Sequence, residues 1–422
     1  MTWKAHYRLV CPVCGGRFDD TEGRFLLGCP EQHAPALLRA VYDEKRLVIH
    51  PESTGVFRYA DWLPVRRTLP GCAGPVAWHS TRLGHRLGLE SLFIAFSGWW
   101  PEKGAFMETC TFKELEAQAV CGRTAPDWTS ALVVASAGNT ARAFHHVCSL
   151  HGLPALVVVP GYGVPLLWST TPPSRRVRLA VIEGAADYTD AIDMAGRIAV
   201  LGGYTAEGGA KNAARRDGMG TVLLAAVEAA GRIPDHYVQA VGSGTGAIAA
   251  WEMSLRLGED GRYGEPRMRL HLGQNAPFTP MVDAWEAGHR DLPALPRGHE
   301  LAAGIHAPVL ANRKPPWGIV GGLFDALSDT RGSMYRVDEH AAVSAGHLFA
   351  DEEGIDIDPA AEIAVATLAQ AVESGRIGRK DLIVLNVTGG GQRRLQAEKA
   401  PVALKPDIVL VQGADLPREA LV

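Results

Sequence analysis

From residue 131 onward, short apolar segments alternate with helix-forming segments, and this alternation limits the chain to few architectures. The strand-like segments are 131–135, 155–159, 177–182, 237–241 and 381–387. The main helical segments are 141–150, 188–200 and 247–257. Short apolar strands alternating with helices are typical of parallel sheets covered on both faces. The pattern therefore predicts an α/β fold of doubly wound parallel sheets.

Three loops follow the carboxyl ends of predicted strands, where such sheets bind their ligands. Gly242-Ser-Gly-Thr-Gly246 separates a strand from a helix. Its glycines let the backbone approach an anion, which the free N–H groups and the helix dipole can bind. It is neither a Walker A loop nor a dinucleotide fingerprint, because the Lys-Ser/Thr pair and the GxGxxG spacing are both missing. A small phosphate fits best, and a ligand-free turn is the alternative.

The other two loops offer different polar groups. Ser136-Ala-Gly-Asn-Thr140 precedes a helix, so its N–H groups suit a carboxylate, and Asn139 adds an amide for a phenolate or carbonyl oxygen. A simple helix cap is the alternative there. Thr388 stands at a strand end before three glycines. Its hydroxyl can bond a ring nitrogen without adding charge, or it is a plain turn residue.

Lys113 lies at the predicted start of a helix, after the loop 98–101. Thr111 is placed to cap this helix, and Glu114 completes a capping-box spacing. Glu114 and Glu116 in the first turn suit the positive end of the helix dipole. A partly buried lysine at that end has a lowered pKa and is a better nucleophile. Taken alone, an ordinary solvated lysine is the alternative.

The segment 207–220 combines Lys211, Arg215 and Arg216 with four glycines. Arginine pairs with phosphate-like oxyanions in a bidentate way, and lysine binds them as a point charge. The glycine content favours a second anion site. A solvated basic loop is the alternative.

The first 45 residues are expected to form a separate small unit. Cys11-Pro-Val-Cys14 is a CxxC knuckle, and Cys29 and His33 follow as CxxxH. Three thiols and an imidazole suit a tetrahedral structural zinc site. A metal-free ribbon with reduced cysteines is the alternative.

Charge and cysteine content restrict the binding partners and the cellular compartment that we expect. The net charge of -4 provides no general attraction to nucleic acid or anionic lipid. No apolar run reaches the roughly 18 residues of a membrane span, and the N-terminus lacks a signal-peptide pattern. Seven cysteines without an export signal indicate a reducing compartment. We therefore expect a cytoplasmic protein that binds neither nucleic acid nor membranes.

Together, an amine, a phosphate cradle, a carboxylate loop and a ring-nitrogen partner are the parts of a pyridoxal-phosphate enzyme. Their order along the chain resembles the tryptophan-synthase-β-like family, fold type II, and within it the threonine synthase branch. Five long blocks are similar to the cysteate synthase family: 101–107, 111–118, 135–144, 207–221 and 239–252. The resemblance extends over most of the chain.

This resemblance implies exchange of the phosphate of O-phospho-L-serine for sulfite through an aminoacrylate, giving L-cysteate. Lys113 would hold pyridoxal phosphate as a Schiff base and carry the proton. The other cofactor contacts would be Asn139 (ring oxygen), Gly242, Ser243, Gly244, Thr245 and Gly246 (phosphate) and Thr388 (pyridine nitrogen). The substrate carboxylate would meet Ser136, Ala137, Gly138 and Thr140. The phosphate and sulfite would meet Lys211, Arg215, Arg216 and Lys103.

The expected organisation is a cysteine-rich unit (1–45), a large cofactor-binding domain (46–125 and 205–422) and a small α/β domain (126–204). The family resemblance suggests a homodimer. The nearest alternative is a threonine synthase acting on O-phosphohomoserine, or β-replacement with another small nucleophile. A nucleotide-dependent oxidoreductase leaves Lys113 without a role, and a non-catalytic zinc-ribbon protein does not explain why all the cofactor contacts are present.

Overall fold

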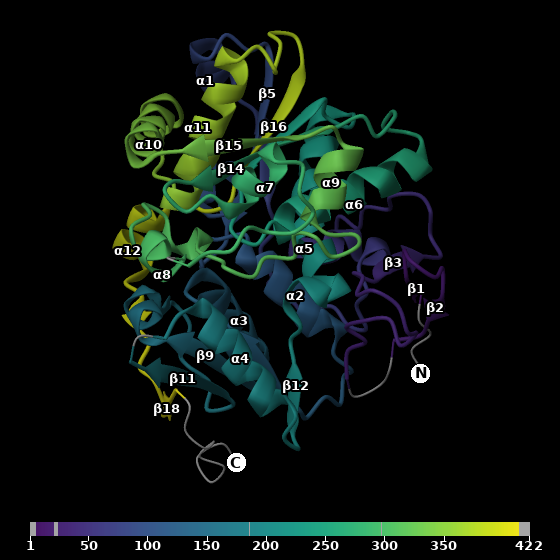
Figure 1. Ribbon diagram of the computed structural model, residues 1–422, viewed down its shortest axis with the longest axis vertical. Coiled ribbons are helices and arrows are strands. Elements are labelled where there is room, and N and C mark those ends of the chain that lie inside the picture. The colour runs from purple at the N-terminus through teal and green to yellow at the C-terminus, as the bar shows by residue number, and fades with distance from the viewer. Residues whose placement is uncertain (1–5, 21–23, 185, 297, 413–422) are drawn as a thin grey trace.

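The computed structural model describes residues 6–20, 24–184, 186–296 and 298–412, and within them the chain forms two parallel sheets. Figure 1 shows the sheet with β9 and β11 in the lower half of the molecule and the sheet with β14 and β16 in the upper half. The α/β class and the doubly wound parallel sheets expected from the alternation are confirmed. No helix in these ranges is long and apolar enough to cross a membrane.

The smaller sheet has five strands, all parallel, in the order β12-β8-β9-β11-β18. Their bounds are Tyr204–Ala206, Ala131–Ala135, Ala155–Pro160, Val177–Glu183 and Ile408–Val411. Helices α3 (Asn139–His151) and α4 (Tyr188–Ala199) pack against it. Val158 of β9 packs in the same cluster as residues of α4, whereas its neighbours Val157 and Val159 pack in the cluster that includes Ala141 of α3. This alternation along β9 is the period of two expected of a strand buried on both faces.

The larger sheet has six strands in the order β15-β14-β13-β16-β5-β4, and only β4 runs antiparallel to its neighbour. Their bounds are Ser333–Val337, Arg269–Asn275, His236–Ala240, Leu382–Val387, Ser91–Phe96 and Val76–His79. The helices are α5 (Ala213–Ala230) and α6 (Thr245–Asp260) on one face, and α10 (Glu339–Glu353) and α11 (Pro359–Glu373) on the other. In β16, Val384 packs in the same hydrophobic cluster as residues of α5, and Leu385 packs in the cluster on the other face, with residues of α11.

Helix α2 (Lys113–Arg123) lies between α5 of the larger sheet and α3 of the smaller one. Leu115 and Ala119 of α2 share a core cluster with Phe144 of α3 and Met219 of α5. At Gly218 of α5 an added Cβ would lie 2.5 Å from the carbonyl oxygen of Leu115, so the close approach of α2 and α5 requires glycine there. Lys113 is therefore held where the two sheets meet.

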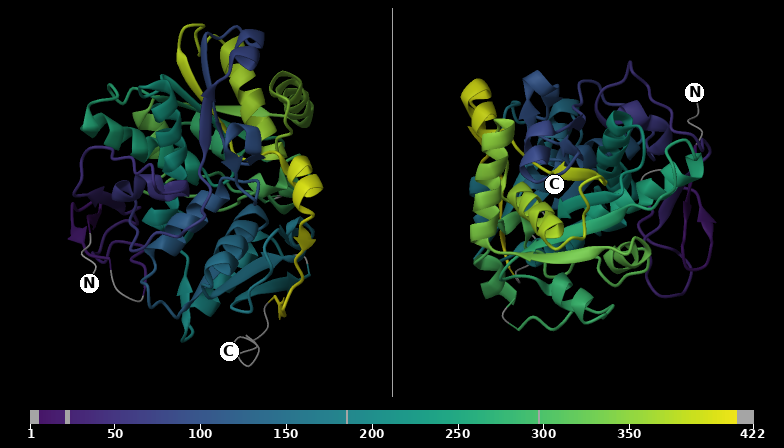
Figure 2. Two further views of the ribbon diagram at one scale, coloured as in Figure 1. Left: turned by 180° about the vertical axis from the view of Figure 1, so that it is seen from behind. Right: turned by 90° about the horizontal axis from the view of Figure 1, so that it is seen from above.

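The N-terminal unit is a small antiparallel sheet in the order β2-β1-β3, with bounds Arg17–Phe18, Tyr7–Val10 and Arg39–Tyr42. Figure 2 shows this purple segment on the flank of the molecule beside the teal helices, in both of its views. The Tyr42 hydroxyl donates to Asp217 of α5 at 2.5 Å, so the unit is attached directly to a helix of the larger sheet.

The C-terminal end of the described chain returns to the smaller sheet. Strand β18 pairs in parallel with β11, although its residues lie in the range 205–422 expected for the large domain. Strand β17 (Val402–Ala403) likewise pairs with β10 (Trp168–Ser169), which lies in the range 126–204 expected for the small domain. Together with β12, which the sequence analysis also did not indicate, β18 adds two strands to the three expected for the smaller sheet.

Candidate active site

One cavity brings together the carboxyl ends of β8, β13 and β16, the start of α2 and one residue of α5. Its lining includes most of the residues singled out from the sequence: Lys113, Ser136, Ala137, Gly138, Asn139, Thr140, Arg215, Gly242, Ser243, Gly244, Thr245, Gly246 and Thr388. These residues come from both sheets. The cavity therefore lies in the crevice where a doubly wound fold places its ligands.

Lys113 is the first residue of α2, and its side chain is 20% exposed. Its Nζ atom lies 3.4 Å from Glu116 Oε2 and 4.7 Å from the centre of the Phe112 ring. Burial lowers the pKa of the Lys113 ammonium, with Arg215 acting in the same direction and Glu116 opposing both. These surroundings favour the neutral amine, which is the nucleophilic form.

The cap of α2 differs from the predicted capping box. Glu114 accepts hydrogen bonds from the Thr109 hydroxyl at 2.8 Å and from the Thr109 N–H at 3.2 Å, not from Thr111. The prediction that Thr111 forms the box with Glu114 is wrong. The reason is that Phe112 already has helical backbone angles, so the N–H of Glu114 donates to the carbonyl oxygen of Thr111, while Thr109 occupies the Glu114 carboxylate. The helix start at Lys113 is unaffected.

The residues that follow β8 form a tight turn into α3. Ser136 Oγ accepts hydrogen bonds from the N–H groups of Gly138 (3.1 Å) and Ala141 (2.8 Å). Asn139 Oδ1 accepts from Arg142 Nη2 at 3.0 Å, which leaves the Asn139 NH₂ as the donor end of that amide. The loop can thus present N–H donors at a helix N-terminus, the arrangement that binds carboxylates and phosphates.

The glycine loop after β13 leads into α6, whose first residue is Thr245. The backbone of Leu310 approaches Gly242 so closely that an added Cβ would lie 2.8 Å from the Leu310 Cα and carbonyl oxygen. Gly244 has a φ of +76°, which favours glycine. The first N–H groups of α6, a helix of 16 residues, therefore face this loop. At Gly242 the neighbouring backbone leaves no space for a side chain.

Thr388 directly follows strand β16 and is 5% exposed. Its carbonyl oxygen accepts a hydrogen bond from the N–H of Phe112 at 2.8 Å. This bond ties the end of β16 directly to the residue that precedes Lys113. Thr388 and Lys113 thus belong to one junction, and both line the cavity.

Glu116 links Lys113 to Arg215 by dividing its two oxygens between them. Oε2 faces Lys113, and Oε1 accepts from the Thr140 hydroxyl at 2.8 Å and lies 3.3 Å from Arg215 Nη1. Arg215 also makes two 2.7 Å hydrogen bonds to Glu207. These acids are buried, and they raise the pKa of Arg215, so that its guanidinium stays charged at the cavity wall.

Three expected anion ligands do not line this cavity. Lys211 is exposed beside the start of α5. Arg216 is buried and donates to Glu252 at 2.9 Å and to the Leu38 carbonyl of the N-terminal unit. Lys103 stacks its Nζ over Trp78 at 4.8 Å. The segment 213–221 is helix rather than loop, so its adjacent arginines point in different directions.

Sequence reasoning missed several residues of the lining. Tyr188, the first residue of α4, reaches the cavity, and burial raises the pKa of its hydroxyl. The segment Val309–Asn312 closes one wall, and Gln239 and Ala360 contribute from β13 and α11. The apolar β13 pattern marked residue 239 as strand only, and nothing in the local sequence of 309–312 indicated a site.

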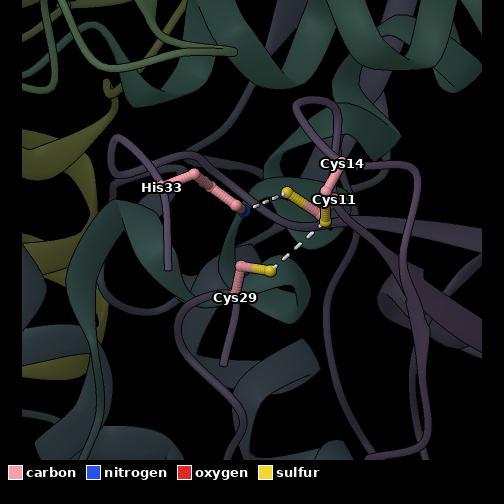
Figure 3. Close-up of side chains that lie close together, drawn as sticks. All are labelled: Cys11, Cys14, Cys29 and His33. Atoms are coloured by element: carbon pink, nitrogen blue, oxygen red, sulfur yellow. Dashed lines mark hydrogen bonds between the residues drawn. The ribbon is translucent and has the colours of Figure 1, made fainter. Parts of the chain in front are cut away.

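The structure also brings the four predicted metal ligands together, away from the cavity. The ligand atoms of Cys11, Cys14, Cys29 and His33 all lie within 4.8 Å of one another (Figure 3). Figure 3 shows the three sulfur atoms and the imidazole nitrogen pointing toward a common centre.

Comparison with known proteins adds independent findings. A family model described as "Pyridoxal-phosphate dependent enzyme" matches residues 102–389. The cysteate synthase of Methanosarcina acetivorans is 46% identical over 416 residues, covering 98% of each chain. That of Methanoculleus marisnigri is 50% identical over 391 residues, covering 92% of this chain and 89% of the relative. The structure of maize serine racemase aligns with a TM-score of 0.57 at 17% identity, over 77% of this chain and 91% of that one.

Proposed function

Because the chain belongs to the pyridoxal-phosphate-dependent enzymes and, within them, to the cysteate synthase family, we propose that it exchanges the phosphate of O-phospho-L-serine for sulfite and forms L-cysteate. The observation that carries the proposal is the convergence in one cavity of a buried amine, a glycine cradle at a helix N-terminus and a strand-end hydroxyl. Each of these is a weak sign alone. Their meeting in a chain similar to cysteate synthases supports the reaction.

The residues of the cavity fit pyridoxal phosphate. The loop Gly242–Gly246 lies at the start of α6, and at Gly242 the Leu310 backbone occupies the place of a side chain. The loop therefore offers backbone N–H groups, which suit a phosphate. Lys113 would hold the aldehyde carbon, and the Asn139 NH₂ would donate to the ring oxygen. Thr388 would meet the pyridine nitrogen with a neutral hydroxyl. When bound there, the cofactor supplies an electron sink that makes the Cα–H bond of an amino acid acidic.

The substrate is held and oriented by groups of this chain. The loop Ser136–Thr140 at the start of α3 binds its carboxylate through N–H groups other than that of Gly138, which, like that of Ala141, already donates to Ser136 Oγ. Arg215, held in place by Glu207 and Glu116, is the expected cation that lines the cavity, and it contacts the phosphate of O-phosphoserine and the incoming sulfite. Lys211, Arg216 and Lys103 are not used in this arrangement, because they lie outside the cavity lining.

Lys113 moves the proton. Its lowered pKa favours the amine, which accepts the Cα proton as general base. Glu116, 3.4 Å away, stabilises the ammonium that results. The Cβ–O bond breaks, and phosphate leaves with the bonding electrons. Sulfite then forms the Cβ–S bond through its sulfur lone pair, and Lys113 returns the proton to Cα.

Product analysis with purified enzyme tests the reaction. O-Phosphoserine with sulfite should yield phosphate and L-cysteate in equal amounts, and the cysteate should be absent without sulfite. The enzyme should show a visible absorbance band that borohydride removes. A colourless protein that gains no band from added pyridoxal phosphate would refute the proposal.

The nearest competing activity is tested in the same assay. A threonine synthase would convert O-phosphohomoserine to threonine and phosphate, and would leave phosphoserine with sulfite unchanged. Sulfide in place of sulfite tests the choice of nucleophile, because any small anion can attack the same carbon. Faster turnover with sulfide than with sulfite would assign the enzyme to another β-replacement.

We also propose that the enzyme acts in the cytoplasm as a homodimer. The seven cysteines support a reducing compartment, since all of those described are free thiols. Light scattering coupled to size-exclusion chromatography should give twice the 45.1 kDa mass of the chain.

A further inference from the structure

The N-terminal unit gathers three thiols and one imidazole from two loops. Cys11 and Cys14 lie in the turn that follows β1, and Cys29 and His33 lie in the segment between β2 and β3. Cys11 Sγ is 3.4 Å from His33 Nε2, and Cys14 Sγ is 3.7 Å from Cys29 Sγ (Figure 3). Segments separated along the chain thus converge on one point, with no carboxylate in the group.

These separations match a tetrahedral ion and not a disulfide. Around Zn²⁺, with Zn–S bonds of about 2.3 Å and Zn–N bonds of about 2.0 Å, neighbouring ligand atoms of a tetrahedron are roughly 3.5–3.8 Å apart. The Cys11–His33 pair at 3.4 Å and the Cys14–Cys29 pair at 3.7 Å are close to these separations, and all four ligand atoms lie within 4.8 Å of one another. A disulfide would require about 2.05 Å between Cys14 and Cys29. Three thiolates and one imidazole are one of the tetrahedral ligand sets of structural zinc sites.

Surrounding hydrogen bonds orient two of the ligands. His33 Nδ1 lies 2.7 Å from the Ala34 carbonyl oxygen. A proton on Nδ1 satisfies that bond and leaves the lone pair of Nε2 facing the cluster. The N–H of Gly16 donates to Cys14 Sγ at 3.4 Å, and the turn is closed by the bond from the Gly15 N–H to the Cys11 carbonyl oxygen. N–H donation to a sulfur stabilises its thiolate form.

We propose that Cys11, Cys14, Cys29 and His33 bind one structural Zn²⁺ per chain. All four positions of the tetrahedron are taken by protein ligands, so no position remains open for a substrate. None of the four residues lines the candidate active site. The proposal therefore stands independently of the proposed reaction.

The ion holds a unit that itself supports the helices of the active site. The ligands bracket Asp20, which pairs with Arg123 at the end of α2, and they precede Leu38, whose carbonyl accepts from Arg216 of α5. Helices α2 and α5 carry Lys113 and Arg215. Loss of the ion should loosen this support without removing any group from the cavity.

Metal analysis of the purified full-length enzyme tests the proposal. Mass spectrometry of the metals should find one zinc per chain, and X-ray absorption should find three sulfur neighbours at about 2.3 Å and one nitrogen at about 2.0 Å. Cys29→Ser and His33→Asn should reduce the zinc content to below a tenth of one per chain. Cys72→Ser and His79→Asn, which change a cysteine and a histidine outside the cluster, should keep one zinc.

The wild-type measurements decide the question even where a ligand variant fails to fold. Zinc-free enzyme with all four ligands reactive toward thiol and imidazole reagents would overturn the proposal, as would a Cys14–Cys29 disulfide. Equal zinc in ligand variants and controls would also overturn it. Activity plays no part in these readouts, so failure of the reaction assay leaves the metal result intact.

Discussion

At the scale of single residues, the protonation of Lys113 depends on three close neighbours. Phe112 and the surrounding core bury the amine, Arg215 repels its charge, and Glu116 attracts it. Because burial and repulsion outweigh attraction, the pKa falls below that of a free lysine. These surroundings agree with the lowered pKa that the sequence predicted for a partly buried lysine at this helix start.

Replacing Lys113 should abolish turnover while the protein stays folded. Lys113→Ala removes the amine that would bind the cofactor and carry the proton, and a general base alone contributes about 10²–10⁴-fold. Turnover and the borohydride-sensitive absorbance band measure the loss. Lys211→Ala is the matched control, since Lys211 is exposed and outside the cavity. Retention of the band in Lys113→Ala would contradict the assignment.

Glu116→Gln should shift the titration of Lys113 to lower pH. The carboxylate raises the pKa of Lys113 against burial, so its removal lowers that pKa further. The amine form is present above the pKa, and cofactor capture by the apoenzyme should rise with pH through it. The capture rate measured against pH should therefore rise at lower pH in Glu116→Gln than in the wild type. An unchanged profile would contradict the coupling, and Glu102→Gln, which alters an exposed acid, is the control.

At the scale of elements, the loops that follow the strands were predictable, and the cavity wall formed by Val309–Asn312 was not. The loops after β8, β13 and β16 follow short apolar strands, so local sequence was enough to place them at a ligand-binding edge. The approach of Leu310 to Gly242 joins residues far apart in the chain. No periodic pattern records such a contact, because tertiary packing determines it.

Gly242→Ala should weaken cofactor binding through this contact. The new Cβ would lie 2.8 Å from Leu310 backbone atoms, and overpacking of this kind costs about 1–3 kcal/mol. Affinity for pyridoxal phosphate should fall by about tenfold to a hundredfold, measured by fluorescence titration. Gly196→Ala in α4 is the control, because nothing lies within 4 Å of its added Cβ. Equal affinities in both variants would contradict the role of the cradle.

The adjacent arginines of α5 show why only part of the predicted second anion site reaches the cavity. Successive residues of a helix are about 100° apart, so Arg215 faces the cavity and Glu207 while Arg216 faces Glu252. Glu252 lies on α6 and is distant in sequence. The buried partners that neutralise Arg216 therefore could not be recognised from composition.

Both arginine substitutions take a partner from buried carboxylates and should lower stability, but only the change at Arg215 should lower turnover per folded molecule. Arg215→Gln removes the charge beside Lys113, and losing a charge-assisted hydrogen bond of about 1.5–3 kcal/mol should lower turnover by about tenfold or more. Arg216→Met leaves Glu252 buried with a lost partner, which costs about 3–5 kcal/mol of stability, while turnover per folded molecule is retained. Turnover and urea unfolding measure the two effects. Unchanged turnover in Arg215→Gln would exclude it as an anion ligand.

At the scale of the whole molecule, α2 connects the three parts of the chain. Its first residue faces the cavity, its flanks pack on α3 and α5, and its last residue, Arg123, reaches the N-terminal unit. The alternation of strands and helices predicted a parallel sheet covered on both faces, the family resemblance implied two such sheets, and the cysteine spacing predicted the separate unit. The return of β18 to the smaller sheet was not predictable, because a short apolar segment does not specify which sheet it joins.

The Asp20–Arg123 pair should make the attachment of the N-terminal unit sensitive to acid. Arg123 donates to both oxygens of Asp20, at 2.5 and 2.7 Å, and lowers the pKa of that carboxyl despite its burial. A carboxyl whose folded pKa is depressed stabilises the fold above its unfolded value of about 3.9, and this contribution disappears as pH falls through the folded pKa.

Asp20→Asn should therefore lower the stability of the enzyme at neutral pH, and the stability of the variant should depend less on acid than that of the wild type. Breaking a buried pair costs about 3–5 kcal/mol, because Arg123 stays buried with its main partner gone. The gap in Tm between wild type and variant should be widest above pH 5 and narrow in stronger acid, since the wild-type pair is then protonated. Asp19→Asn is the control, because the ion pair between Asp19 and Arg8 lies at the surface. A gap that is independent of pH would show that Asp20 acts through packing and not through its charge.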